Sequence, residues 1–282
     1  MSSLSTEPRI HVLLYTFNKA DELGQTLASL RKTDYDNYKV FLLNNGSTDH
    51  TSKILDALPQ KMFPGMEIIN LPVNIGAPAA RNWLLALPEH ETCEYIAYFD
   101  DDIRVEPDWL KKMLAALKEN PQAGVVGAKI LNIGKPKTIQ HSGGILTKSE
   151  DWIDNVAIWT SVTDNGQFDN VSERDYLMGC ANLYRIDAIR DVGDFDLQFS
   201  PTQFDDVDHH LRMRLKGWKV LFHGGVEVLH TRKSGGPHNH NHIANRYKLQ
   251  NKYTKRMAGQ IISQGAVVDF LKKHPWAKEQ NG

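Results

Sequence analysis

The residues best suited to chemistry are three consecutive acids, Asp100, Asp101 and Asp102, which follow the apolar run Tyr95–Phe99. Neighbouring carboxylates at the end of a buried strand repel one another unless a cation neutralises them. Because alternate side chains of an extended chain point the same way, we expect Asp100 and Asp102 to share one side while Asp101 faces the other. Oxygen ligands suit Mg²⁺ or Mn²⁺, which also bind diphosphate oxygens. Taken alone, a solvated acidic turn explains the three residues equally well.

A second acidic group, Asp205, Asp206 and Asp208, lies at the start of a helix predicted over residues 207–216, with Gly217 as its C-cap. Acids in the first turn of a helix are favoured by the helix dipole, which explains one or two of them without any catalysis. The dipole hardly explains all three. At least one of these acids is therefore left without an explanation from the helix dipole.

The histidines are weaker signals. His230 follows the apolar run 226–229, and a lone histidine after a strand is more often structural than a metal ligand. Three further histidines occupy alternate positions in a segment rich in proline and asparagine. A polar loop is a better interpretation of this segment than a metal site. These are His238, His240 and His242.

Composition excludes several classes of function. Lys and Arg total 33 against 34 Asp and Glu, so no basic face for nucleic acid is indicated. Cys93 and Cys180 lie outside any zinc or disulfide spacing, which favours a reducing setting. The glycines form neither a P-loop nor a dinucleotide-binding fingerprint, which argues against ATP hydrolysis and NAD chemistry. The first 22 residues resemble neither a secretory signal nor a membrane span, so we expect a cytoplasmic protein, with contact to a membrane surface left open.

The elements that must position these residues alternate in the first hundred positions as βαβ units do. We predict strands over 10–15, 40–43, 66–71 and 95–99, and helices over 21–30, 51–58 and 79–87, with Asp21 as a helix cap. Strands that end in polar turns before helices place those turns along the carboxyl edge of a sheet, where open α/β folds bind ligands. The first half therefore resembles a nucleotide-binding layer.

The second half is less regular. We predict a helix over 109–117, strands over 123–131 and within 139–146, a strand over 219–223 and a basic helix over 243–257. The polar stretch 147–174 is not assigned to any element. The absence of repeats and low-complexity tracts favours one two-part domain over two independent ones.

With these motifs laid out, the chain resembles family 2 glycosyltransferases of the GT-A fold, from about residue 10 to about residue 252. The resemblance consists of several ordered motifs. They are Thr16-Phe17-Asn18, Asn44-Asn45-Gly46-Ser47-Thr48-Asp49, Asn74-Ile75-Gly76, Ala80-Arg81-Asn82, Asp100 to Asp102 with Pro107-Asp108-Trp109, Met178-Gly179-Cys180-Ala181, Val192-Gly193-Asp194-Phe195-Asp196, Asp205-Asp206-Val207-Asp208 with Gly217-Trp218, His230, and Asn245-Arg246.

The resemblance implies an α/β fold with a Rossmann-like, mostly parallel central sheet and a smaller acceptor-side part. It implies residues 1–106 as the nucleotide-sugar-binding half, 107–257 as the acceptor-binding and catalytic half, and 258–282 as an extension. It also implies roles for individual residues. The residues that would bind the nucleotide sugar are Thr16, Phe17, Asn18, Asn44, Asn74, Arg81, Asp100 and Asp101. Asp100, Asp102 and His230 would bind the metal. Asp206 and Asp205 would be the catalytic residues.

Departures from the family pattern occur at three positions. Asn44 stands where an acid usually accepts the pyrimidine N–H, and its amide oxygen accepts that bond more weakly. Asp205 replaces a glutamate one methylene longer, which leaves Asp206 the better candidate for the base. Leu197 replaces an acid that commonly follows Phe-Asp on the acceptor side.

The implied activity is an inverting transfer of a sugar, with uridine diphosphate as the expected carrier, to an acceptor hydroxyl of a carbohydrate or glycoconjugate. Asp206 would accept the hydroxyl proton while Mn²⁺ or Mg²⁺ stabilises the departing diphosphate. Arg81 would either balance phosphate charge or hold the aspartates by a salt bridge. Residues 232–242 have the composition of a lid, and Trp152, Trp159 and Trp218 are either sugar-stacking or core residues.

Two alternatives remain open from the residues. A sugar-nucleotide pyrophosphorylase or metal-dependent phosphohydrolase would use similar acids, but the former usually carries a glycine-rich loop after its first strand, and residues 15–19 contain no glycine. A non-catalytic nucleotide-sugar-binding protein would not need both acidic groups.

Overall fold

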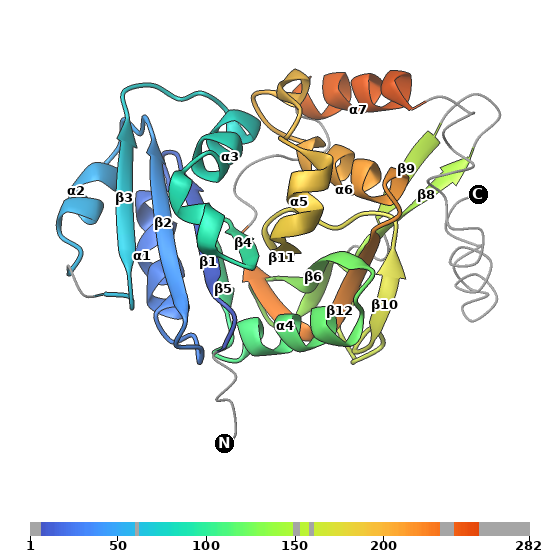
Figure 1. The fold of residues 1–282 in the computed structure, drawn as a ribbon, viewed down its shortest axis with the longest axis horizontal. Coiled ribbons are helices and arrows are strands. Elements are labelled where there is room, and N and C mark those ends of the chain that lie inside the picture. Colours follow the sequence, from blue (N-terminus) through green and yellow to red (C-terminus); the bar gives the residue numbers. More distant parts are fainter. Residues whose placement is uncertain (1–6, 60–61, 149–152, 158–160, 232–239, 254–282) are drawn as a thin grey trace.

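The computed structural model describes residues 7–59, 62–148, 153–157, 161–231 and 240–253. A ten-stranded sheet runs through these residues in the order β10-β12-β6-β11-β4-β1-β2-β3, with β5 paired to β12 and β7 to β6 (Figure 1). The strands are β1 Ile10–Thr16, β2 Tyr38–Asn45, β3 Met66–Leu71, β4 Tyr95–Phe99, β5 Ile103–Val105, β6 Ala123–Asn132, β7 Thr138–His141, β8 Gly144–Lys148, β9 Ile153–Ala157, β10 Val171–Arg174, β11 Ala181–Arg185 and β12 Lys219–His230.

Helices cover both faces of this sheet. The α-helices are α1 Ala20–Leu30, α2 Thr51–Asp56, α3 Ala77–Leu85, α4 Trp109–Glu119, α5 Ile186–Val192, α6 Asp205–Leu215 and α7 His240–Lys252, and two 3₁₀-helices are η1 Pro88–Thr92 and η2 Leu197–Phe199. Separately from the large sheet, β8 and β9 form an antiparallel pair. Among the described residues, no helix has both the length and the apolarity needed to cross a bilayer.

The first half confirms the predicted βαβ units. Strands β4, β1, β2 and β3 are parallel neighbours, and β1 is buried on both sides because apolar side chains occupy both of its faces. Ile10, Val12 and Leu14 pack into one core while Leu13 packs into the other. A continuous apolar run is therefore the sequence pattern of this strand.

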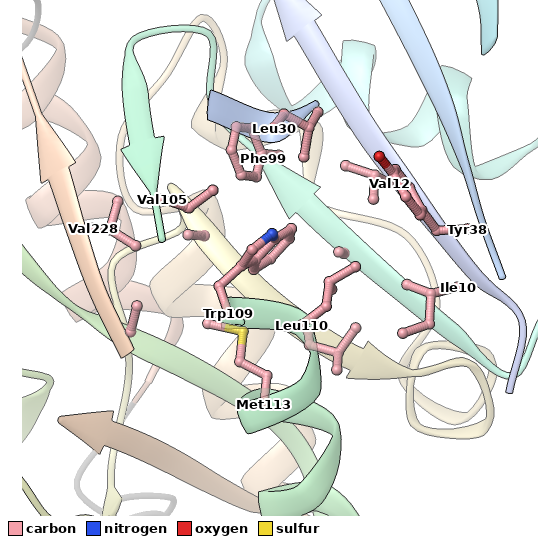
Figure 2. Packing of buried hydrophobic residues seen from close by; sticks show 14 of the residues in the cluster. Ile10, Val12, Leu30, Tyr38, Phe99, Val105, Trp109, Leu110, Met113 and Val228 are labelled. Carbon is pink, nitrogen blue, oxygen red and sulfur yellow. The ribbon is translucent and has the colours of Figure 1, made fainter. Parts of the chain in front are cut away.

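Two hydrophobic cores lie on the two faces of the sheet. Apolar side chains of α1 and α4 fill the first, where Trp109 is fully buried against Phe99 (Figure 2). The Trp109 indole N–H donates to Thr33 Oγ1 at 2.9 Å, so its one polar atom is paired. Side chains of α3, α5 and α6 fill the second core. The mixed half and the parallel half of the sheet thus share both cores.

Strand β12 is longer than predicted. The expected strand over 219–223 and the apolar run 226–229 form one strand that pairs in parallel with β6, with an irregularity between His223 and Glu227. Gly224 lies at this irregularity, and a Cβ there would come within 1.5 Å of the Phe168 carbonyl oxygen. The glycine permits this close approach, and the strand continues to His230 at the edge where β4 ends.

The cap of α1 was predicted wrongly. The helix begins at Ala20, and its backbone N–H donates to Asp49 Oδ2 at 3.1 Å. Asp49 Oδ1 also accepts from the backbone N–H of Thr51 in the first turn of α2. The polar turn after β2 therefore caps two helices, whereas Asp21 lies inside α1.

Candidate functional site

A cavity of about 600 Å³ opens at the carboxyl ends of β1, β2 and β4. Both acidic groups contribute to its wall, together with the segments Met178–Cys180 and Pro201–Phe204. The cavity thus lies where parallel α/β sheets bind ligands and brings together residues more than one hundred positions apart.

All three strand-end acids, Asp100, Asp101 and Asp102, line this cavity, and the expected alternation is confirmed: the carboxylates of Asp100 and Asp102 lie close to His230, whereas that of Asp101 faces the loop after β1. Strand β4 ends at Phe99, as predicted, and the acids occupy the turn that follows it. Asp101 Oδ2 accepts from the backbone N–H of Phe17 at 3.2 Å, and the Asp101 carbonyl accepts from Thr26 Oγ1 at 2.9 Å. These bonds fix the turn against the loop after β1.

Asp102 is the most strongly held of the three. Its Oδ2 accepts from Lys19 Nζ at 2.6 Å and from Thr231 Oγ1 at 3.2 Å, while its Oδ1 lies 3.0 Å from His230 Nε2. Burial opposes ionisation of this carboxyl, but the His230 and Lys19 contacts outweigh burial and hold its pKa well below the usual range. Asp102 is therefore a carboxylate at neutral pH.

His230 presents a nitrogen to the same point. Its Nδ1 lies 3.0 Å from Gln140 Oε1, an acceptor, so Nδ1 carries the hydrogen of that bond. Without an ion, the 3.0 Å contact between Nε2 and Asp102 Oδ1 needs a hydrogen on Nε2, and a bound cation would take the place of that hydrogen. Nitrogen and oxygen ligand atoms of Asp100, Asp102 and His230 all lie within 4.8 Å of one another. Such a histidine, with its second nitrogen bonded to an outer partner, is the usual arrangement of a metal ligand, so the residues fit a divalent cation.

The other two strand-end acids are less acidic than usual. Burial, with Asp102 as the nearest like charge, raises the pKa of Asp101 to about 7. Burial also raises the pKa of Asp100 to about 6, although the Arg81 charge opposes the rise. A cation placed between these carboxylates would lower both pKa values again, because it favours the ionised forms.

Arg81 joins the two acidic groups. Its Nη1 donates to Asp205 Oδ2 in a very short contact, and its Nη2 lies 3.7 Å from Asp100 Oδ1. The Arg81 side chain is buried and also lies near the rings of Tyr15 and Phe195. Of the two roles expected for Arg81, the structure shows the ion pairs that hold the aspartates.

Asp205 and Asp206 are placed differently. Asp205 is buried in its pair with Arg81, whereas Asp206 is half-buried on the cavity wall. Asp206 Oδ2 accepts from the Gly179 N–H at 2.7 Å, and Oδ1 accepts from the Val207 N–H at 2.8 Å. A Cβ on Gly179 would lie 2.9 Å from Asp206 Cβ, so this approach requires glycine. Burial and the neighbouring Asp205 raise the pKa of Asp206 to about 6.

The loop before α6 is held in a strained conformation. Gln203 and Phe204 have φ values of 81° and 69°, a region that residues with a Cβ rarely adopt. The buried Asn245 side chain of α7 donates to the carbonyls of Phe199, Thr202 and Gln203 at 2.7 to 3.1 Å. Helix α7 thereby fixes the loop that leads directly into Asp205 and Asp206.

The predicted nucleotide-binding residues divide into two sets. Phe17 and Asn74 line the cavity, as do Arg81, Asp100 and Asp101. Thr16, Asn18 and Asn44 do not line it. Asn44 is buried, donates to Ser52 and Asn70, and accepts from Ser47, while Asn18 Oδ1 accepts from the Thr48 N–H. These side chains shape the turn after β2.

Sequence reasoning missed several cavity residues, and three of them bond to predicted site residues. Lys19 and Gln140 hold Asp102 and His230, and Asn45 donates to Asn74 Oδ1 at 3.0 Å. Asn45 lies within a quoted motif, so its position next to Asn44 was a usable signal. Neither Lys19 nor Gln140 belongs to a pattern that marks it, because both meet their partners only through the fold.

Trp218 does not line the cavity. It packs against the second core, and its indole N–H donates to Asp191 at 3.1 Å, which confirms the core interpretation for this residue. Trp152, Trp159 and His238 lie outside the described residues, as does most of the expected lid, 232–242. From that segment, His242 lines the cavity in the first turns of α7.

Another group of metal-ligating type, His11, His90 and Cys93, is buried on the far side of β1 from the first core. His90 Nε2 lies 2.7 Å from the Leu84 carbonyl, and the two Nδ1 atoms lie 2.8 Å apart. Burial lowers the pKa of both imidazoles. One hydrogen shared between two neutral rings accounts for this contact.

The sequence profile described as Glycosyl transferase family 2 matches residues 11–193. The chain is 25% identical over 195 residues to a poly-beta-1,6-N-acetyl-D-glucosamine synthase of Staphylococcus epidermidis, which covers 66% of this chain and 42% of the synthase. The chain thus spans less than half the length of the curated relatives it matches.

Two solved structures share the fold. GalNAc-T7 with UDP, GalNAc and Mn²⁺ aligns with a TM-score of 0.66 at 14% identity, over 85% of this chain and 47% of that one. The mannosyltransferase PcManGT from Pyrobaculum calidifontis, in complex with GDP-Man and Mn²⁺, aligns with a TM-score of 0.59 at 18% identity, over 82% and 59%. The neighbours are GT-A glycosyltransferases, so the curled, mostly parallel sheet flanked by helices confirms the expected fold class.

Proposed function

The chain belongs to glycosyl transferase family 2, and from this premise we propose that it transfers a sugar from a nucleoside-diphosphate sugar to an acceptor hydroxyl, with inversion at the anomeric carbon. The observation that carries the proposal is the cavity in which the ligand atoms of Asp100, Asp102 and His230 face the same space as the Asp206 carboxylate. One cavity would then hold both parts that a transferase needs, a place for a diphosphate and a base for a hydroxyl.

A divalent cation, Mn²⁺ or Mg²⁺, is part of the proposal. Five aspartates line the cavity, Asp100 to Asp102 with Asp205 and Asp206, and Lys19 and Arg81 are the lysine and arginine that pair with them. The carboxyl groups therefore outnumber these basic side chains, which favours a bound cation. Asp100, Asp102 and His230 would hold the ion, which would stabilise the charge on the departing diphosphate. Solved neighbours contain Mn²⁺ together with a nucleotide, which supports the same pairing here.

Asp206 is the proposed base. Its pKa of about 6 leaves it ionised at neutral pH while keeping it more basic than an ordinary aspartate. The N–H groups of Gly179 and Val207 orient both oxygens, and the half-buried carboxylate is open to the cavity. Asp206 would accept the proton of the acceptor hydroxyl as that oxygen attacks the sugar. Asp205 would act through Arg81, by keeping the guanidinium beside the cavity.

The nucleotide would lie along Phe17, Asn45 and Asn74, at the ends of β1 and β2. We propose uridine as the base, and a carbohydrate acceptor from bacterial surface polysaccharide or glycoconjugate synthesis. The matched relative's name supports the second part, since it is a synthase of poly-beta-1,6-N-acetyl-D-glucosamine. Neighbours with UDP and with GDP-Man show that the fold accepts either nucleotide.

A panel of nucleotide sugars tests the proposal. Thermal stabilisation by each donor is measured with and without Mn²⁺, and donors that stabilise are then assayed for transfer to carbohydrate acceptors. We expect stabilisation by a uridine donor that requires Mn²⁺, and its loss in Asp102→Ala. Asp187→Asn, at an exposed position on α5, serves as the control and should behave as the parent.

The outcomes separate the alternatives. Release of pyrophosphate or free phosphate without transfer would indicate a pyrophosphorylase or phosphohydrolase. Metal-dependent donor binding without turnover on any acceptor would support a non-catalytic binding protein. Donor binding that is unaffected by Asp102→Ala would contradict the metal site.

A further inference from the structure

Lys19 places a positive charge next to the proposed metal site. Its ammonium lies 2.6 Å from Asp102 Oδ2, and only 13% of the Lys19 side chain is exposed. Lys19 precedes the first residue of α1, so the start of that helix places its stem at the cavity wall. A nearly buried lysine on a metal-ligand carboxylate must affect how that carboxylate binds a metal.

The two oxygens of Asp102 have different partners. Oδ1 faces His230 Nε2, and Oδ2 accepts from Lys19 and Thr231. A divalent cation bound at Oδ1 would be separated from the ammonium by the width of one carboxylate. Two positive groups so close in a poorly solvated cavity repel each other strongly. Metal binding therefore weakens the contact between Lys19 and Asp102.

Among the described residues that line the cavity, the other carboxylates already have partners. Asp100 and Asp205 already face Arg81, and Asp206 accepts from two backbone N–H groups. Asp101 accepts from the Phe17 N–H. A diphosphate would supply new anionic oxygens within the same cavity, which Lys19 lines.

We propose that Lys19 is a built-in counter-ion that couples the binding of the metal to the binding of the donor diphosphate. Without ligands its ammonium neutralises Asp102. When the metal and the diphosphate bind together, the ammonium transfers from the carboxylate to a phosphate oxygen. The metal alone is disfavoured, because it leaves Lys19 without an anion. This inference rests on the proposed function, since it takes the metal and the diphosphate as ligands of this cavity.

Coupling of this kind is measured as a change in one ligand's affinity caused by the other. We suggest titrating Mn²⁺ by electron paramagnetic resonance, without nucleotide and with saturating UDP, on the parent and on Lys19→Met. Lys19→Met keeps the length and apolar stem of the side chain but removes its charge. Lys53→Met, at an exposed position of α2, is the matched control.

In Lys19→Met we expect Mn²⁺ without nucleotide to bind at least about tenfold more tightly than in the parent, because the repelling charge is gone. The tightening of Mn²⁺ binding by UDP should shrink by a similar factor. Lys19→Arg keeps the charge and should stay close to the parent in both values, and Lys53→Met should change neither. Circular dichroism verifies folding, and Lys19→Gln replaces the methionine variant if that one does not fold.

Other results would overturn the inference. Mn²⁺ affinity that is unchanged or lower in Lys19→Met would mean that Lys19 only orients Asp102. If Lys19→Arg behaves like the methionine variant, the charge is not the cause. A parent protein that binds Mn²⁺ neither with nor without UDP would contradict the proposed function as well, which distinguishes that failure from a failure of the coupling alone.

Discussion

Two acidic groups border one cavity, and their surroundings differ. In the helix-start group, Asp205, Asp206 and Asp208, basic side chains of the protein neutralise the negative charge. Asp205 pairs with Arg81, and Asp208 contacts Arg212, Lys252 and the Tyr253 hydroxyl. In the strand-end group, Asp100 to Asp102, the Oδ1 atom of Asp102 lies 3.0 Å from the Nε2 atom of His230. Similar acidic segments therefore have different surroundings, which fit the proposal that the helix-start group supplies a base and the strand-end group binds a cation.

The two acidic groups differ in how far backbone N–H groups donate hydrogen bonds to their carboxylates. Helix α6 begins at Asp205, so the Val207 N–H is free to donate to Asp206. Free N–H groups at a helix start favour a carboxylate without any metal. In the turn after β4, Asp101 accepts from the Phe17 N–H, but Asp100 and Asp102 depend on the side chains of Lys19, Arg81 and His230, which come from other parts of the chain.

Asp206→Asn should have the largest effect on activity. The amide keeps the size of the side chain but cannot accept the proton, so transfer should fall by about 10² to 10⁴-fold. Mn²⁺-dependent donor binding should persist, because the strand-end group is intact. Rates and donor affinity are measured on the same preparation, and near-parental transfer would remove Asp206 from its proposed role.

Arg81→Met should have the largest effect on stability. Removing one partner of a buried ion pair leaves Asp205 without its counter-charge, which typically costs about 3–5 kcal/mol. Urea unfolding of the parent, of Arg81→Met and of Arg81→Lys gives the values, with the lysine variant expected between the other two. If the methionine variant is as stable as the parent, Arg81 does not hold the two groups together.

Thermal stabilisation by Mn²⁺, measured as a function of pH, should test Asp100 of the strand-end group as a metal ligand. The folded-state pKa of Asp100 is about 6, above its ordinary value, so the metal-free protein binds its proton more tightly than the unfolded chain does. This contribution to stability is present at low pH and is lost as the pH rises through about 6. Mn²⁺ binds the ionised form, so its thermal stabilisation should be larger at about pH 7.5 than at about pH 5.5. Equal stabilisation at both pH values would argue against Asp100 as a ligand.

Asn245→Ala should have the smallest effect of the four. It removes a donor from three carbonyls of the loop before α6, and the loss of such buried bonds costs about 1–3 kcal/mol. Because that loop holds positive-φ residues in front of Asp206, transfer should also decrease, while Mn²⁺ affinity should remain parental. A lower Mn²⁺ affinity would show that the two groups are less independent than their contacts indicate.

Much of the fold could be predicted from the sequence. Strands buried on both faces, such as β1 and β4, appear as continuous apolar runs, and the turns after them carry the polar residues. The two acidic groups were found because acids cluster there in the chain. The strand β12 was predicted in two pieces, because a glycine such as Gly224 interrupts the apolar pattern of the sequence. In the structure Gly224 lies at an irregularity of the pairing with β6, and the strand continues beyond it.

The partners of these acids could not be predicted from local patterns. Lys19 reaches Asp102 from 83 positions away and Gln140 reaches His230 from 90 positions away, and neither spacing has a periodicity. The relative direction of the three acids, in contrast, follows from the alternation of an extended chain, because Asp100 and Asp102 lie together while Asp101 contacts the loop after β1. Asn44 was expected at the nucleotide, and the structure shows its amide bonded to Ser52 and Asn70.

The most direct test is a crystal structure of the protein with Mn²⁺ and a uridine diphosphate sugar, with the anomalous signal of manganese used to locate the ion. The account predicts manganese bound by Asp100, Asp102 and His230, with the diphosphate on the ion and Asp206 facing the sugar. Manganese bound elsewhere, or a nucleotide sugar bound in this cavity with no ion at these three residues, would contradict it.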